Sequence, residues 1–468
     1  MATKQGAVFT FTGNCYFQDR PSALKHERFL KLVDVLRQSD ASFTNLELVI
    51  QDGEDWPAHV AGNGRAASYL GAPPLVVEEL KWMGIRMVYA ANNHSSNFGE
   101  GGVLTTVKYL EAGGLPYAGI GPSLSRATAP GFLETASGRV ALVSAADWGP
   151  RGRSDLPYQM PVGVIAGDGD GFFKSRPGVN LVRYDAVNTV DRAALDALRR
   201  ISRELGWEEA KATRRAGGAR AEPFLSPKVM GCEQDTDKEF HFMGRKFVEG
   251  DRFDFRTEPF QEDLERNERW IRTARRQADW VVVAYHDQGA RRAFDEEHTR
   301  VFARRSIDAG ADIFVNHGAR HGGVEFYKGK VILYGQPPFY FQNESVRHAP
   351  PELLSRWGLG PQQTIIDFLE QRAVAEGRVG AVVGQRRADW RGSCAHQVVY
   401  GPDRQVKEVR VLPLDIPNAG PIAERGATFL AEPGSETAMN VLQRAAERCK
   451  DYGTRVEVRD GVGYVRPK

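Results

Sequence analysis

The chain has 468 residues, and its hydrophobic fraction of 41% and charged fraction of 26% are those of an ordinary globular protein. Its 62 basic and 60 acidic residues leave a net charge of +2, which gives no field that would favour nucleic acid or an anionic membrane. No apolar run reaches the ~18 residues of a membrane span, and the first residues, MATKQGAVFTFTG, lack a signal-peptide pattern. Because its four cysteines are far apart, we expect free thiols and a cytoplasmic protein.

Strand and helix patterns alternate through the first 145 residues. Apolar spacing predicts strands at 7–12, 42–48, 86–91 and 139–145, and helices at 29–36, 73–83 and 103–111. Strands that alternate with helices indicate a largely parallel sheet covered by helices, so the expected fold class is α/β.

The alternation breaks between about residues 150 and 260. Glycine and proline are dense at 161–179, a helix is expected near 190–205, and charged residues crowd 208–222. This stretch is interpreted as a long insertion, the alternative being a lid over the functional site.

The α/β pattern resumes after the insertion. It predicts a helix at 261–277 and strands at 280–285, 312–315 and 330–334. Beyond these, a helix near 362–375, strands near 396–400 and 405–412, and a helix near 436–449 indicate an α+β region. We therefore expect a core domain over 1–345 and an α+β extension over 346–468 that packs on it.

Polar side chains follow five of the expected strands. In chain order they are Asn14, Glu47, the run Asn92-Asn93-His94, the pair His286-Asp287, and His317 with His321. Ligands of open α/β sheets bind at the carboxyl ends of strands, so we expect these side chains to gather there. Imidazole and carboxylate groups suit zinc, manganese or iron, and one or two such ions could activate a water molecule.

Each of these residues alone has a structural interpretation. A histidine at a strand end is more often simply hydrogen-bonded, and asparagine is common in turns. Glu47 is harder to explain in this way, because a buried carboxylate needs a cation or donors. Arg320 lies next to His321 and is a candidate for binding an anionic group of the substrate.

At these residues the chain resembles the CapA family, also called the poly-γ-glutamate capsule biosynthesis family, whose core is similar to calcineurin-like metallophosphoesterases. The matching stretches are FTGN at 11–14, TNLE at 44–47, ANNHSSNFGEGG at 91–102, VVVAYHDQG at 281–289, and AGADIFVNHGARHGGVEFYKGKVILYG at 309–335. The resemblance spans nearly the whole chain. It implies a four-layer α/β/β/α sandwich and a metal-dependent hydrolytic centre.

The resemblance also implies a role for each residue. It makes Asn14, Glu47, Asn93, His286 and His317 the metal ligands. The family's last histidine would fall at residue 319 or 320, so we assign His321, with one residue inserted, as the remaining ligand. It makes His94 a non-ligand histidine that assists the leaving group or the transition state, and we add Asp287 as a second catalytic candidate. Asn92 and Arg320 are the candidate substrate-binding residues.

Two positions depart from the family pattern. Asn14 replaces a metal-binding aspartate, and Asn97 replaces an aspartate that often follows the NNH motif. The loss of two charges should weaken divalent binding or change the preferred metal.

The expected function is hydrolysis of an amide or related carbonyl-derived bond in a small or peptide-like, γ-glutamyl-like substrate. The alternatives are a metallophosphoesterase and a non-catalytic accessory or binding protein of polymer metabolism. We expect no nucleic acid or membrane partner, and the sequence leaves open whether the chain forms a homo-oligomer.

Overall fold

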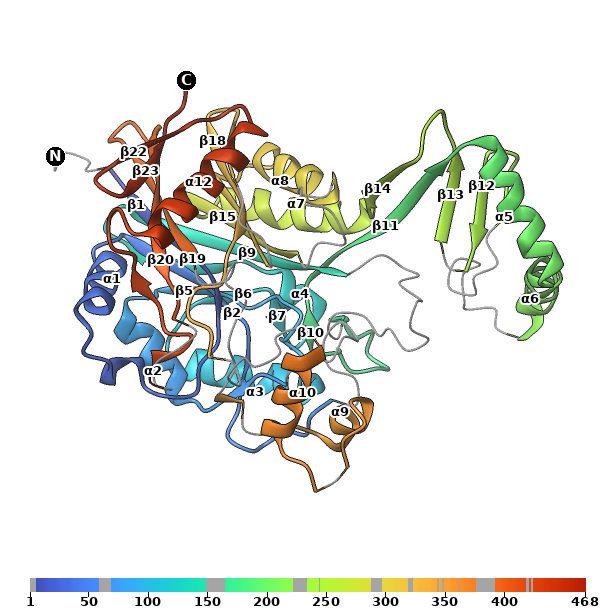
Figure 1. Ribbon diagram of the computed structural model, residues 1–468, viewed down its shortest axis with the longest axis horizontal. Helices are drawn as coiled ribbons and strands as arrows, with labels where there is room; N and C mark the ends of the chain where they lie inside the picture. The colour runs from blue at the N-terminus through green and yellow to red at the C-terminus, as the bar shows by residue number, and fades with distance from the viewer. Residues whose placement is uncertain are drawn as a thin grey trace.

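The computed structural model describes residues 6–58, 69–148, 165–221, 234–243, 245–287, 297–318, 323–342, 345–346, 349–360, 362–375, 392–417, 421 and 424–468. Two large β-sheets and their flanking helices form the main body, and a smaller lobe projects from it (Figure 1). The expected α/β class is confirmed. Along the described residues, every helix is too short or too polar to cross a bilayer.

The first sheet has nine strands, and its centre is formed by β1 (Val8–Cys15). On one side of β1 lie the parallel strands β2 (Ala41–Leu46), β5 (Met87–Tyr89) and β6 (Tyr117–Ala118). On the other side lie the antiparallel strands β19 (Gly392–Tyr400), β20 (Val406–Asp415), β23 (Val462–Val465) and β22 (Val456–Arg459), with β21 (Phe429–Leu430) also on β20. The expected extension therefore supplies strands to the same sheet as the N-terminal strand.

The second sheet has ten strands around the parallel set β9 (Gly138–Trp148), β15 (Trp280–Asp287), β16 (Ile313–Gly318) and β18 (Lys330–Gln336). Its remaining strands are β8 (Gly131–Thr135), β11 (Leu181–Val190), β12 (Glu239–Phe242), β13 (Arg245–Glu249), β14 (Asp254–Pro259) and β17 (Val324–Tyr327). Two short pairs, β3 (Val49–Ile50) with β4 (Gly71–Ala72) and β7 (Ile120–Gly121) with β10 (Gly178–Val179), lie outside both sheets.

The two sheets share one hydrophobic core. Side chains of the first sheet, such as Phe11 and Phe43, meet side chains of the second, such as Val282 and Val315. A second cluster packs the first sheet against α1 (Glu27–Arg37) and α2 (Leu75–Met83), and a third packs the second sheet against α7 (Gln261–Arg275) and α8 (Glu297–Asp308). Burial on both faces explains why the central strands read as nearly continuous apolar runs.

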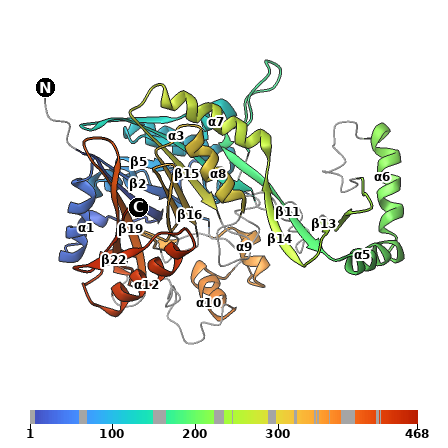
Figure 2. The same ribbon diagram turned by 90° about the horizontal axis from the view of Figure 1, so that it is seen from above.

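The remaining helices lie around this body (Figures 1 and 2). They are η1 (Pro21–Ala23), α3 (Gly99–Ala112), α4 (Leu124–Thr128), α9 (Pro351–Arg356), α10 (Ile365–Ala375) and α12 (Glu436–Lys450). The last of these, α12, packs on β19 and β20.

The described part of the insertion forms the projecting lobe. Strands β11 and β14 pair antiparallel from Tyr184↔Pro259 to Thr189↔Asp254 and lead out of the body. At their far end, α5 (Arg192–Glu204), α6 (Trp207–Ala221), β12 and β13 pack around a small cluster that includes Leu195 and Phe240. Both views show this lobe projecting from the main body, which favours an insertion over a lid (Figures 1 and 2).

A buried polar pair lies inside the body. His396 of β19 is fully buried, and its Nδ1 lies 3.0 Å from Oε1 of Gln336 at the end of β18. Burial lowers the pKa of His396 from 6.5 to about 4. The folded protein therefore keeps this imidazole neutral.

Acidification is expected to destabilise the fold through His396. Below about pH 6.5 the unfolded chain binds a proton that the folded state does not accept until about pH 4. The free energy of unfolding therefore decreases as the pH is lowered through this range. The slope from one such group is about 1.4 kcal/mol per pH unit. Denaturant titrations at several pH values between these two give the free energy of unfolding as a function of pH. Its slope against pH should be smaller by nearly one proton in His396→Gln than in the unmodified protein, and an equal slope would contradict the assignment.

Candidate functional site

The carboxyl ends of strands from both sheets meet at one place. In the first sheet Asn14 pairs with Asn45 across β1 and β2, and in the second sheet His286 pairs with His317 across β15 and β16. A contact between Asn45 Nδ2 and His286 Nδ1, at 3.4 Å, joins the two sheets. The structure thus brings together strand ends that lie more than 200 residues apart in sequence.

A glycine allows the chain to approach closely beside Asn14. A Cβ atom on Gly13 would lie 1.9 Å from the carbonyl oxygen of Pro337, so no larger residue fits here without moving the backbone. The backbone N–H of Phe339 then donates to the carbonyl oxygen of Asn14 at 2.8 Å. The glycine of the FTGN stretch therefore places β1 against the segment that follows β18.

Asparagine side chains connect the three strand ends of the first sheet. Asn45 Nδ2 donates to Asn14 Oδ1 at 3.0 Å, and Asn92 Nδ2 donates to Asn45 Oδ1 at 3.1 Å. Asn92 Oδ1 in turn accepts from the backbone N–H of His94 at 2.9 Å. The side-chain amide of Asn92, which we expected to bind substrate, takes part in this series of hydrogen bonds. Asn45 is the residue that sequence reasoning missed, although the TNLE stretch contains it.

His94 is held in a defined orientation opposite Glu47. Its Nδ1 lies 2.8 Å from Asn97 Oδ1, which also accepts from the backbone N–H of Leu70 at 2.9 Å. Since that backbone group can only donate, the shared atom is an oxygen and His94 Nδ1 carries the hydrogen. His94 Nε2 lies 3.9 Å from Glu47 Oε1, and both side chains are almost fully buried.

This geometry changes the meaning of Asn97. In the sequence, Asn97 stands where the family pattern often has an aspartate, and we expected this loss of charge to weaken divalent binding. The amide oxygen still provides an acceptor for His94 Nδ1. What the replacement removes is the negative charge beside the imidazole.

His286 and His317 form a neutral pair. Their Nδ1 atoms lie 3.0 Å apart, and both side chains are completely buried. Burial and the neighbouring His94 lower the pKa of His286 from 6.5 to about 3, and burial and His286 lower the pKa of His317 well below its usual value. Tyr89 stacks on the ring of His317 with the centroids 4.8 Å apart. Neutral imidazole is the form that binds metal ions.

The donor set can be compared with what a metal ion requires. Tetrahedral zinc with Zn–N bonds of ~2.1 Å holds two nitrogens roughly 3.4 Å apart. The two Nδ1 atoms lie 3.0 Å apart, which is within about half an ångström of that separation. Within the described residues, His317 Nε2 and Asn93 Oδ1 are buried without a hydrogen-bond partner. The same residues contain no group of three His, Cys, Asp or Glu side chains that could hold an ion. A metal on the histidine pair would therefore need amide oxygens to complete its ligand set, and the buried Asn93 Oδ1 is a donor of that kind.

Asp287 points away from this cluster. Successive residues of a strand face opposite sides, so Asp287 of β15 faces α8 while His286 faces the other sheet. Its Oδ2 accepts a hydrogen bond from Thr299 and lies 3.5 Å from His298 Nε2. The catalytic role expected for Asp287 stays a prediction, and Arg320 and His321 lie outside the described residues.

Comparison with known proteins gives one family and two relatives. The family model described as "Bacterial capsule synthesis protein PGA_cap" matches residues 8–164 and 190–343. The "Uncharacterized protein y4sH" and "Uncharacterized protein y4uA" of Sinorhizobium fredii (strain NBRC 101917 / NGR234) are each 27% identical to this chain over 452 residues. Each alignment covers 94% of this chain and 89% of the relative.

Proposed function

The chain belongs to the bacterial capsule synthesis protein family PGA_cap, and from this membership we propose that it is a metal-dependent hydrolase. The observation that carries the proposal is the neutral, buried pair His286–His317 placed beside His94 and Glu47 at the ends of strands from both sheets. Helices outside two sheets that share one core also support the four-layer, metallophosphoesterase-like arrangement that the resemblance implies.

The residues divide into those that would hold the ion and those that would move a proton. His286, His317, Glu47, Asn93 and Asn14 would hold one or two divalent ions of zinc, manganese or iron, and such an ion supplies Lewis-acid activation of water. His94 keeps its Nδ1 hydrogen on Asn97, so its Nε2 is the atom that gives or takes a proton at the leaving group. The carboxylate of Glu47 lies near enough to stabilise the protonated imidazole.

We propose an amide or related carbonyl-derived bond as the target, in a small or γ-glutamyl-like substrate. The family's link with capsule polymers supports this choice over a phosphoester. A phosphoesterase remains the second candidate because of the core that the family shares with metallophosphoesterases.

Two measurements test the proposal. Metal analysis of the purified protein should find about one or two equivalents of a divalent transition metal, since two-metal and single-metal hydrolases both occur. An activity panel of γ-glutamyl amides, lactams and phosphoesters, each with zinc, manganese and iron, should show metal-dependent release of amine. Protein that neither binds metal nor turns over any substrate would indicate a binding or accessory role instead.

Asn14→Asp is expected to tighten metal binding. An aspartate can still accept the hydrogen bond from Asn45 Nδ2, so the fold should be preserved while one negative charge is added at the site. Attraction in a partly desolvated site should raise the affinity by roughly 10- to 100-fold. Competition with a chelator measures the metal affinity. As a control, Asn440→Asp adds the same charge on the exposed face of α12 and should leave that affinity unchanged. Unchanged affinity would place Asn14 outside the coordination sphere.

A further inference from the structure

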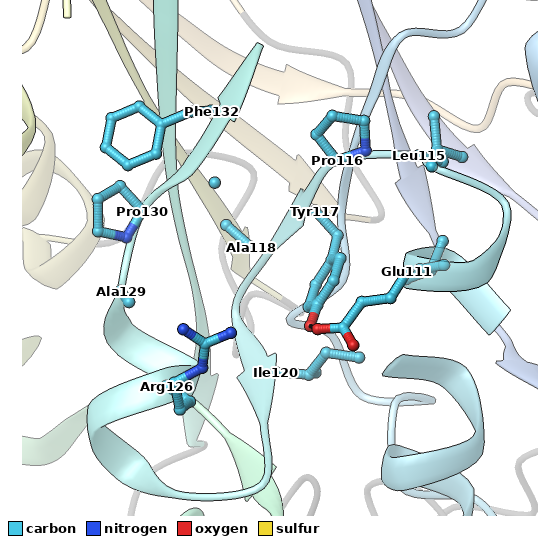
Figure 3. Close-up of a pocket in the computed structure, with 13 residues that line it drawn as sticks. Glu111, Leu115, Pro116, Tyr117, Ala118, Ile120, Arg126, Ala129, Pro130 and Phe132 are labelled. Carbon is cyan, nitrogen blue, oxygen red and sulfur yellow. Dashed lines mark hydrogen bonds between the residues drawn. The ribbon is translucent and has the colours of Figure 1, made fainter. Parts of the chain in front are cut away.

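A cavity of about 340 Å³ lies at the side of the body. It is formed by the end of α3, strand β6, helix α4 and the start of β8, and no candidate active-site residue lines it (Figure 3). Strand β6 is the edge of the first sheet, and β8 pairs with β9 of the second sheet. The cavity therefore lies where the edges of the two sheets meet.

Charges of opposite sign line the cavity. Figure 3 shows the guanidinium of Arg126 on one side and the carboxylate of Glu111 beside the Tyr117 hydroxyl on the other. The Tyr117 hydroxyl donates to Glu111 Oε1 at 3.1 Å. Among the described residues, the Arg126 guanidinium makes no hydrogen bond or ion pair. Its planar donors are thus available to a carboxylate that enters from solvent.

The rest of the lining is mostly apolar. Phe132, Pro116 and Pro130 line the cavity above the charged groups in Figure 3, and aliphatic side chains from α3 and β7 complete the lining. An apolar wall with a few convergent polar groups is typical of small-molecule sites, and the volume lies in their range of ~300–1,000 Å³. The cavity therefore suits a molecule with an apolar body and charged groups at one end.

We propose that this cavity binds a free apolar α-amino acid, with its carboxylate on Arg126 and its ammonium on Glu111. A simple carboxylic acid would satisfy Arg126 but would meet the negative charge of Glu111, and a simple amine would meet the positive charge of Arg126. Only a zwitterion satisfies both, while its side chain covers Phe132 and the prolines. The site is independent of the hydrolase proposed above.

Binding should stabilise the protein, because the ligand joins two sheet edges. Strand β8 already approaches β6 so closely that a Cβ on Gly131 would lie 2.2 Å from the Tyr117 carbonyl oxygen. A ligand that contacts both edges binds only the folded state, so it raises the melting temperature by an amount that grows with the logarithm of one plus the ratio of the free ligand concentration to Kd. Because both charged side chains are exposed to solvent, we expect a Kd of about 1 mM for a ligand of this size.

The test compares phenylalanine with two analogues that each lack one charge. Calorimetric titration of the full chain should show saturable binding of phenylalanine, and the melting temperature should rise as phenylalanine is added. The corresponding acid, 3-phenylpropionate, and the corresponding amine, phenethylamine, should bind at least about tenfold more weakly. Arg126→Gln should lose the binding, and Arg203→Gln, which removes an exposed arginine from the distant lobe, should retain it.

The outcomes separate clearly. The proposal is overturned if phenylalanine gives no saturable effect, if an analogue with one charge binds as well, or if Arg126→Gln binds as the unmodified protein does. Both arginines are exposed, so neither variant should lose its fold, which the melting temperature without ligand verifies. Since no metal or substrate is added, failure here leaves the proposed hydrolase intact.

Discussion

His286→Ala and His317→Ala are each expected to lose the bound metal and all measurable hydrolysis. Both imidazoles are neutral, buried and in contact, so each would contribute one nitrogen to the same ion. Loss of residues that only orient ligands typically weakens metal binding by 10- to 100-fold, and loss of a ligand should exceed about 100-fold. Metal content after dialysis, measured by elemental analysis, is the readout.

Truncation of a buried histidine also creates a cavity, so the experiment needs a folding control. His286→Gln and His317→Gln fill more of that space and keep a polar group, yet they lack an imidazole nitrogen. They should retain the thermal transition of the metal-free protein while still failing to hold metal. Full metal content and full rate in all four variants would mean that the proposed centre is wrong.

His94→Ala should have the opposite signature. We expect metal content to remain nearly unchanged while the turnover number falls by roughly 10²–10⁴, the usual contribution of a general acid or base. The reason is that His94 already has its Nδ1 on Asn97 and faces Glu47 with its Nε2. Steady-state kinetics on the best substrate of the panel, together with metal analysis, measures both quantities.

A matched control is available on the far side of the first sheet. His26 caps the start of α1 through its Nδ1, and His26→Asn keeps a capping acceptor there while it removes an imidazole. That variant should keep both metal and rate. If His94→Ala instead lost the metal, His94 would be a ligand and its assigned role would be overturned.

The sequence was a good guide to the central strands and helices because their burial follows a simple period. Helix α1, expected at 29–36, spans Glu27–Arg37 and buries Phe29, Leu32, Val33 and Leu36. Strand β15, expected at 280–285, spans Trp280–Asp287 and is buried throughout. In both cases the apolar side chains that form the core are also those that set the period.

Helix α8 was missed for the opposite reason. Its buried face includes His298, Thr299 and Ser306, so the sequence shows too few apolar residues at helical spacing to predict it. The hairpin of β22 and β23 had a usable signal that we overlooked. Asp460 and Gly461 both have positive φ, and the Asp-Gly pair is typical of the tight turn between two antiparallel strands.

For the site, sequence could predict which strand ends carry ligating groups, but it could not predict side-chain contacts. The gathering of Asn14, His94, His286 and His317 follows from the shared direction of parallel strands. The outward turn of Asp287 toward Thr299 depends on strand register, and a shift of one residue would reverse it. The role of Asn45 as the link between sheets also appears only in three dimensions.

The pairing of β1 with β19 has a consequence for biosynthesis. Phe11 lies opposite His396, so the strand that carries Asn14 gains one of its two neighbours only after nearly 400 residues have left the ribosome. Until then one edge of β1 exposes unpaired backbone groups, which can pair with other chains. Such long-range closure slows folding, so the nascent chain should depend on chaperones during synthesis, and truncated chains that end before β19 should aggregate.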